Sequence, residues 1–281
     1  MEKERYQRLF DKIKKEAITV DYSPAEKELS VGTSKFGGKP YLPKDFVWPY
    51  YEGTDFEGIN KNRPLSFIAQ IHLEEIAGYD KDNQLPHSGM LYFFYELCTM
   101  KWGFDPKDKG CARVFFVDTD KDLQAAAFPE DMEEYCILPE FEMQFSGKTD
   151  LPYYEEISEY VMDLEWDEYD EESALYGYEM PEEGISKLLG YADIIQNSML
   201  LECEEACNGI YCGGIPAITE EQKKEMLEQS KEWILLFQIS TLEKEGYELM
   251  FGDCGSIYFY IRKQDLKERN FENVWMILQC F

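Results

Sequence analysis

Two short stretches decide the fold: SFIAQIH at residues 66–72 and LLFQIST at residues 235–241. Each is an apolar run that carries one glutamine, Gln70 in the first and Gln238 in the second, followed in both by isoleucine. A short apolar run that ends at polar residues is typical of a buried strand. An amide in such a strand must find hydrogen-bond partners, because burying it without them costs a few kcal/mol.

Three further blocks match in the same order along the chain. They are HSGMLYFFY (87–95) with DCGSIYFYI (253–261), SKFGGKP (34–40) with SKLLGYA (186–192), and ARVFFVD (112–118) with VWMILQC (274–280). Four ordered matches predict a duplicated unit of roughly 90–100 residues. The glycine-led aromatic and β-branched runs within it are expected to be strands.

We therefore predict an α+β fold built from an internally duplicated, strand-rich unit. The chain (1–281) is expected to form a single domain, since two homologous halves, about 30–120 and about 185–281, would share one core. Helices are expected to flank this core. Residues 3–17 place five apolar residues on one helical face. Thr219 and Gln222 form a capping box before a helix at 220–231, and RKQDLKERNF (262–271) is expected to contain one or two helical turns.

An acidic, aromatic segment, about 129–183, lies between the predicted halves. It contains 20 acidic residues, one basic residue (Lys148) and ten aromatic residues. The spacing of Ile157, Tyr160, Val161 and Leu164 predicts an amphipathic helix. Two interpretations stay open: a connecting layer whose aromatic side chains pack onto the sheet, or a surface that docks a basic protein or mimics a nucleic acid.

The composition limits the classes of function. The chain of 281 residues has 57 acidic and 28 basic residues, a net charge of −29. Such a charge disfavours binding to nucleic acid and would favour a basic protein as partner, although it also simply keeps a protein soluble. No apolar stretch is long enough to cross a membrane and the charged N-terminus does not resemble a signal peptide, so we expect a cytoplasmic protein. The sequence does not indicate an oligomeric state.

The eight cysteines contain no CxxC pair. Cys203, Cys207 and Cys212 form the one cluster, but the two histidines of the chain, His72 and His87, lie far from it in sequence. Zinc sites usually have tighter pairs with nearby partners, so we predict neither a metal site nor a cofactor.

Gln70 and Gln238 allow two interpretations. In the structural one, the amides bond to each other or to facing backbone and fix how the halves pack. In the functional one, they line a cleft between the halves and contact a ligand. The candidate binding residues of this cleft are Trp48, Gln70, His87, Gln238 and Asp253.

No catalytic residue is predicted. FGGKP (36–40) lacks the length and the following Ser or Thr of a phosphate-binding loop and is expected to be a tight turn. His87 and Cys254 would form a nucleophile–base pair only if the two halves brought their turns together, and no orienting group is evident.

The ordered motifs GGKPYLPKDFVWP, PLSFIAQIHLEEI, LPHSGMLYFF, GDCGSIYFYIRKQDL and FENVWMILQC resemble the YwqG-like family of uncharacterised bacterial proteins. The resemblance covers about residues 30–120 and 185–281. It implies a cytoplasmic, duplicated α+β protein without an assigned activity or catalytic residues. We expect a non-enzymatic binding protein that uses its acidic face or the cleft between the halves; the alternative is an enzyme acting on a small molecule in that cleft.

Overall fold

The structure is a computed structural model. It describes residues 2–25, 27, 29–158, 165–178, 184–214, 218–244 and 246–281. Within these ranges, no helix has both the length and the apolar character needed to cross a membrane.

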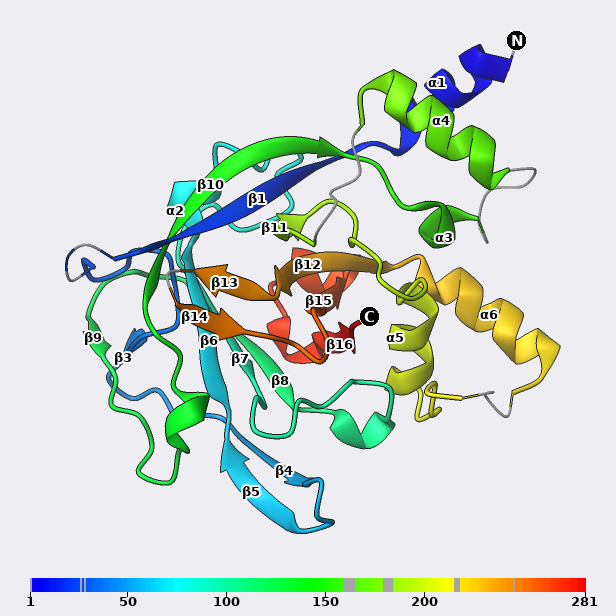
Figure 1. Ribbon diagram of the computed structural model, residues 1–281. Coiled ribbons are helices and arrows are strands. Elements are labelled where there is room, and N and C mark those ends of the chain that lie inside the picture. Colours follow the sequence, from blue (N-terminus) through cyan, green and yellow to red (C-terminus); the bar gives the residue numbers. More distant parts are fainter. Residues whose placement is uncertain are drawn as a thin grey trace.

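A ten-stranded antiparallel sheet forms the centre of the molecule (Figure 1). In spatial order its strands are β16 (Trp275–Gln279), β15 (Ser256–Arg262), β12 (Trp233–Ser240), β11 (Ser186–Leu189), β1 (Lys15–Pro24), β10 (Phe141–Asp150), β2 (Lys35–Phe36), β6 (Ser66–His72), β7 (Met90–Tyr95) and β8 (Ala112–Val117). Strands β1 and β10 pair over ten residues in the middle of this order. Each side then continues with a short strand and a run of three longer strands.

Smaller elements surround this sheet. Three two-stranded sheets pair β3 (Tyr41–Pro43) with β9 (Leu123–Ala125), β4 (Tyr50–Thr54) with β5 (Asn60–Pro64), and β13 (Leu242–Lys244) with β14 (Tyr247–Leu249). The helices are α1 (Glu2–Ile13), α2 (Leu73–Ile76), α3 (Tyr154–Ile157), α4 (Trp166–Tyr176), α5 (Leu200–Cys207), α6 (Glu220–Ser230) and α7 (Lys263–Lys267). Short 3-10 turns occur at η1 (Pro106–Asp108), η2 (Glu134–Cys136) and η3 (Phe271–Asn273).

The predicted core strands are confirmed. The two glutamine-bearing runs are β6 and β12, and the glycine-led runs are β7 and β15, which pair with them. Both pairs contain a β-bulge, one between Phe67 and Ala69 and one between Leu235 and Phe237. The mixture of strands and helices agrees with an α+β class. The capping box at Thr219 and the short helix after β15 are also present.

Both halves contribute to one hydrophobic core. The ring of Phe93 on β7 lies 4.9 Å from that of Phe237 on β12 and 5.2 Å from that of Phe259 on β15. All three rings are fully buried and belong to a single cluster. The two sides of the sheet therefore curve until their faces pack on each other, and the hydrophobic effect couples them.

The predicted helix at residues 3–17 is shorter in the structure. Helix α1 ends at Ile13 and β1 begins at Lys15, so Ala17 lies in a strand. The segment AITVDY alternates and contains β-branched residues, which favour a strand. The apolar face predicted for the first part of this helix is confirmed. Tyr6 and Phe10 on α1 are buried in a separate small cluster that includes Tyr169 of α4.

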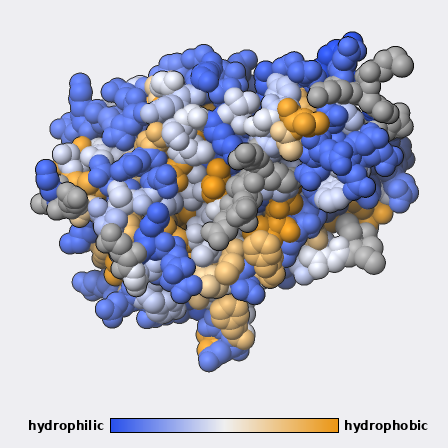
Figure 2. All heavy atoms as spheres, turned by 45° about the horizontal axis from the view of Figure 1, so that its top comes forward, coloured by the Kyte–Doolittle hydropathy of each residue, from blue (hydrophilic) through white to orange (hydrophobic). Residues whose placement is uncertain are grey.

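The acidic segment contributes more than a connection. Its residues 141–150 form β10, which pairs with β1 and β2 inside the sheet. This central place was not expected from the sequence. Ile157 ends helix α3, whereas Tyr160, Val161 and Leu164 of the predicted amphipathic helix lie outside the described residues. Polar residues cover most of the face of the molecule shown in Figure 2.

Candidate functional site

The five predicted binding residues occupy different environments. Gln70 and Gln238 are fully buried, Trp48 is half-buried, and His87 and Asp253 are exposed in the turns before β7 and β15. No hydrogen bond or ring contact found among the described residues joins two of the five. A shared cleft that they line together therefore stays a prediction.

The amide of Gln70 is occupied by the backbone of a loop. Its Oε1 accepts from the N–H of Tyr41 at 2.9 Å, and its Nε2 donates to the carbonyl oxygen of Thr33 at 2.8 Å. The hydroxyl of Tyr92, paired with Gln70 in the sheet, donates to the carbonyl oxygen of Tyr41 at 2.7 Å. The two polar ends of the side chain thus tie the segments before and after β2 to the core strands.

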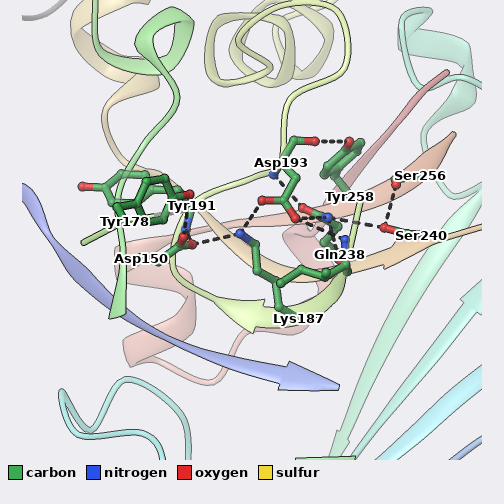
Figure 3. Close-up of polar contacts among 10 residues, drawn as sticks. Asp150, Tyr178, Lys187, Tyr191, Asp193, Gln238, Ser240, Ser256 and Tyr258 are labelled. Atoms are coloured by element: carbon green, nitrogen blue, oxygen red, sulfur yellow. Dashed lines mark hydrogen bonds and ion pairs between the residues drawn. The ribbon is translucent and has the colours of Figure 1, made fainter. Parts of the chain in front are cut away.

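Gln238 makes the same contacts in the second half. Its Oε1 accepts from the N–H of Asp193 at 2.8 Å, and its Nε2 donates to the carbonyl oxygen of Ile185 at 2.6 Å. Tyr258, paired with Gln238, donates its hydroxyl to the carbonyl oxygen of Asp193 at 2.6 Å (Figure 3). The two glutamines therefore bond to facing backbone, each within its own half, as one of the structural alternatives expected.

A buried ion-pair network surrounds Gln238 (Figure 3). The Nζ of Lys187 lies 2.9 Å from Asp150 and 2.7 Å from Asp193, and all three side chains are at most 3% exposed. Burial alone would lower the pKa of Lys187, but the two carboxylates outweigh it and raise that pKa above its ordinary value. Asp150 also accepts from the hydroxyl of Tyr178 and the N–H of Tyr191.

The loop after β11 approaches this network closely. Gly190 has a φ of +70°, and a Cβ there would lie 2.6 Å from Oδ2 of Asp150 and 2.7 Å from Cβ of Ala17. Both the left-handed backbone and the lack of space require glycine. This glycine lets the N–H of the next residue, Tyr191, reach Asp150.

Glu156 on α3 adds a further buried carboxyl group. It is 5% exposed, and its Oε2 has no hydrogen-bond partner among the described residues. Burial raises the pKa of Glu156 to about 7, while the positive charges of Lys15 and Lys187 oppose that rise. The polar groups around Lys187 are otherwise satisfied internally, which is typical of a network that fixes structure and not of one that awaits a ligand.

A cavity of about 290 Å³, here called the basic cavity, lies where the two halves meet. The first half contributes the residues before and at the start of β8, and the second half contributes the ends of α5, β12, β15 and β16 with the turns around α7 and η3. The cavity is lined by Pro106, Lys109, Gly110, Ala112, Arg113, Ala206, Cys207, Gly209, Trp233, Arg262, Asp265, Glu272, Asn273, Val274 and Trp275.

The three cations of the basic cavity differ in their partners. Arg262 is paired with Glu204 at 2.7 Å, and its guanidinium lies over the ring of Trp233, 4.7 Å from the centroid. Lys109 and Arg113 are exposed, and neither forms an ion pair or hydrogen bond with any residue that the structure describes. Lys109 and Arg113 are thus the two cations of this cavity whose charges no described side chain pairs with.

Two tryptophans form the apolar wall of the basic cavity. The Nε1 of Trp233 donates to Glu204 at 2.9 Å, and the Nε1 of Trp275 donates to the carbonyl oxygen of Gly103 at 2.9 Å. Their polar atoms are therefore occupied, and the indole carbons are what these residues offer to a ligand. Cys207 also lines the cavity, but burial raises the pKa of its thiol to about 11, so the thiolate is scarce near neutral pH.

Helix α5 also contributes to a second cavity, of about 460 Å³. This acidic cavity is lined by Glu155, Ser158, Asn197, Ser198, Leu201, Glu202, Glu205, Cys212, Gly214, Ile218, Glu220 and Lys223. One carboxylate oxygen of Glu202 accepts from the side-chain amide of Asn197 at 2.6 Å, and the other is buried without a described partner. Burial raises the pKa of Glu202 to about 7.

The nucleophile–base pair and the cysteine cluster considered in the sequence do not form in the part of the chain that is described. His87 and Cys254 are exposed, and no described contact joins them. Cys203 is buried and Cys207 exposed, and the described residues contain no group of three or more His, Cys, Asp or Glu side chains arranged to hold a metal ion. All eight cysteines are free.

The residues of the basic cavity were missed in the sequence. One local signal was present: the segment KDKGCAR (107–113) carries three basic residues in a strongly acidic chain. Its partners Trp233, Arg262 and Trp275 lie more than a hundred residues away, and only the packing of the halves brings them to it.

Residues 34–280 match the DUF1963 model, described as a domain of unknown function. No curated protein matches the chain. The matched range includes both predicted halves, the acidic segment and every residue of the basic cavity. The chain therefore belongs to the DUF1963 family.

Proposed function

We propose that the protein is a non-enzymatic binding protein that holds a small organic anion in the basic cavity between its two halves. The single observation that carries this proposal is the pair of cations without partners, Lys109 and Arg113, beside Arg262 in one cavity. Because no described carboxylate pairs with either side chain, both are available to an anion that enters the cavity.

We also propose that the halves arose by duplication. The recurring set of contacts supports this: a glutamine that bonds to a loop N–H and carbonyl, a tyrosine that bonds to the same loop residue, and a β-bulge in each strand pair. Ligand sites often lie between structural units, and the basic cavity lies where the two halves meet. The YwqG-like assignment and a bacterial, cytoplasmic origin belong to the same proposal, on the sequence resemblance.

The alternative of an enzyme in this cavity has less support. A general acid or base would have to reach the ligand, and the lining carboxylates are Asp265 and Glu272. One oxygen of Asp265 accepts from the side-chain amides of both Asn270 and Asn273, which favours a structural role. Glu272 is exposed at the rim, where it is well placed to repel surplus negative charge.

A second proposal, a basic protein as partner, draws on the acidic surface. The net charge of −29 and the four glutamates of the acidic cavity favour it. Capture of a basic test protein such as a polylysine-tagged carrier should weaken as salt rises from low to physiological concentration. Capture that is insensitive to salt would count against this surface.

The anion-binding proposal is tested by tryptophan fluorescence. We expect a saturable change, from Trp233 and Trp275, on titration with at least one of sodium benzoate, sodium phenylphosphate and sodium cyclohexanecarboxylate. Arg113→Glu should move the titration to at least about tenfold higher concentration, whereas Lys244→Glu, the same charge change at an exposed position on β13, should leave it in place. A titration that Arg113→Glu leaves in place, or that the cation benzylamine reproduces, would contradict the proposal.

A further inference from the structure

We infer that the ligand of the basic cavity is a small aromatic monocarboxylate, an inference that rests on the proposed function and specifies its ligand. Three properties of the cavity lead to this class: its balance of charge, the surface that its tryptophans present and its volume.

The charges at the cavity sum to zero, so what favours a single negative charge on the ligand is how these charges are paired. Lys109, Arg113 and Arg262 supply three positive charges, and Glu204, Asp265 and Glu272 supply three negative ones. Glu204 neutralises Arg262, so the unpaired Lys109 and Arg113 are left to bind the ligand. A dianion such as a phosphate ester would gain from the same two cations but would also be repelled by the two lining carboxylates.

Arg113 is suited to bind a carboxylate. Its guanidinium presents several N–H donors in a planar fork that matches the two oxygens of a carboxylate. Gly110 has a φ of +92°, which favours glycine, and its Cα side faces the guanidinium, since a Cβ there would be in ordinary contact with Nη2 of Arg113 at 3.4 Å. Lys109 on the same loop adds a second positive charge without requiring a fixed geometry.

The tryptophans favour an aromatic body on the ligand. Both indole N–H groups are already bonded within the protein, and Trp233 and Trp275 are only 3% and 5% exposed, so the small surface that they present to the cavity is carbon. The guanidinium of Arg262 already stacks over Trp233. A flat aromatic ring would extend this stack, because arginine and aromatic groups attract each other face to face.

The volume limits the ligand to a single ring or a small fused system. At about 290 Å³, the basic cavity lies at the lower end of the roughly 300–1,000 Å³ typical of sites for drug-sized molecules. A dinucleotide or a long peptide would not fit inside it. Benzoate is therefore a suitable probe, with cyclohexanecarboxylate as the non-aromatic match and phenylphosphate as the dianionic match.

The test is isothermal titration calorimetry of the full chain with these three probes. We expect benzoate to bind at least tenfold more tightly than either matched probe. Arg113→Glu should weaken benzoate binding about 10- to 100-fold, the range expected for a lost charge-assisted hydrogen bond. Arg113→Lys should weaken it less, because it keeps the charge but loses the fork, and Lys244→Glu should leave it unchanged.

The outcomes separate the ligand class from the proposed function. If phenylphosphate or cyclohexanecarboxylate binds as tightly as benzoate and Arg113→Glu abolishes that binding, the aromatic monocarboxylate is wrong but the cavity remains a binding site. If no probe binds, or if Arg113→Glu has no effect on those that do, the proposed function fails as well. An unchanged melting temperature of the ligand-free Arg113→Glu protein establishes that the variant is folded.

Discussion

The two halves hold equivalent lysines in different surroundings. Lys35 and Lys187 each pair across the sheet with a core glutamine. Lys35 contacts one carboxylate, that of Glu140, whose side chain is 28% exposed, and burial lowers the pKa of this lysine. Lys187 contacts two buried carboxylates, Asp150 and Asp193, and its pKa is raised despite equal burial. The contacts that satisfy the backbone recur between the halves, whereas the charges do not.

The strand ends differ in the same way. Counted from the Gln70–Tyr92 and Gln238–Tyr258 pairs, Glu96 at the end of β7 corresponds to Arg262 at the end of β15. Glu96 is buried and bonds to the nearby Thr99, whereas Arg262 lines the basic cavity. The two halves thus share the contacts of their strands, whereas the residues at the strand ends differ and line the basic cavity on one side. If this difference is real, variants of the shared core and of the glutamines should affect both halves alike, whereas variants of the charged residues should not.

The largest effect is expected from removing the last strand. Deletion of residues 273–281 removes β16, whose five residues are all buried, and should unfold the whole chain because both halves share one core. Loss of the cooperative transition in circular dichroism would show this. Deletion of Phe281 alone, which is 81% exposed, is the control and should leave a folded protein. A deleted protein that melts cooperatively would mean that the first half folds by itself.

The two lysines should differ in their contribution to stability. Lys187→Met leaves two buried carboxylates without a counter-ion and should lower the free energy of unfolding by about 3–5 kcal/mol. Lys35→Met should cost less, because Glu140 is partly exposed and can be solvated. Urea denaturation at neutral pH measures both values. Equal losses would contradict the difference in electrostatics between the halves.

The charged network of the second half should also make stability depend on pH. Because burial raises the pKa of Glu156 to about 7 in the folded state, the folded protein binds more protons than the unfolded one between about pH 4.5 and 7. The contribution of Glu156 is therefore full below that window and is lost as the pH rises through 7. Lys15, Lys187, Asp150 and Asp193 face this carboxyl group and set the size of the effect.

Glu156→Gln isolates that effect. Relative to the original protein, the variant should gain up to about 3 kcal/mol of stability between pH 5 and pH 8, because the amide cannot ionise. Glu155→Gln, the same change at the exposed neighbouring position, is the control and should show no such gain. Parallel stability curves for all three proteins would show that Glu156 does not ionise in a buried site.

The smallest effects, and the most similar between halves, are expected at the glutamines. Gln70→Leu leaves the N–H of Tyr41 without its partner, and Gln238→Leu does the same for Asp193, so each should cost about 1–3 kcal/mol. Chemical denaturation of the two variants provides the comparison. A large loss for one and none for the other would indicate that the halves are not built alike.

The sequence predicted the strands that are apolar on both faces and missed those that are not. β6 and β12 are continuous apolar runs, and their glutamines drew attention because a buried amide needs a partner. β10 reads FEMQFSGKTD, within an acidic segment, and only its ten-residue pairing with β1 places it in the sheet. β2 is two residues long, too short for any periodic pattern. Long-range pairing of this kind leaves no local signal.

The same limit applies to the candidate site. The sequence predicted that the buried amides of Gln70 and Gln238 form hydrogen bonds. In the structure their partners are backbone groups, among them the N–H groups of Tyr41 and Asp193. The basic cavity combines residues 106–113 with residues 206–275, so its charge balance exists only after the halves pack. Composition gives only the sum of the charges, 57 acidic and 28 basic residues, and so does not indicate where basic residues gather in the fold.

The central claim is that the second half, where it meets β8, carries the binding site. A crystal structure of the protein with sodium benzoate tests it most directly. We predict benzoate in the basic cavity, with its carboxylate on Arg113 and its ring against the stack of Arg262 on Trp233. Benzoate bound in the acidic cavity or at the strand end that carries Glu96, with the basic cavity unoccupied at a saturating concentration, would contradict the claim.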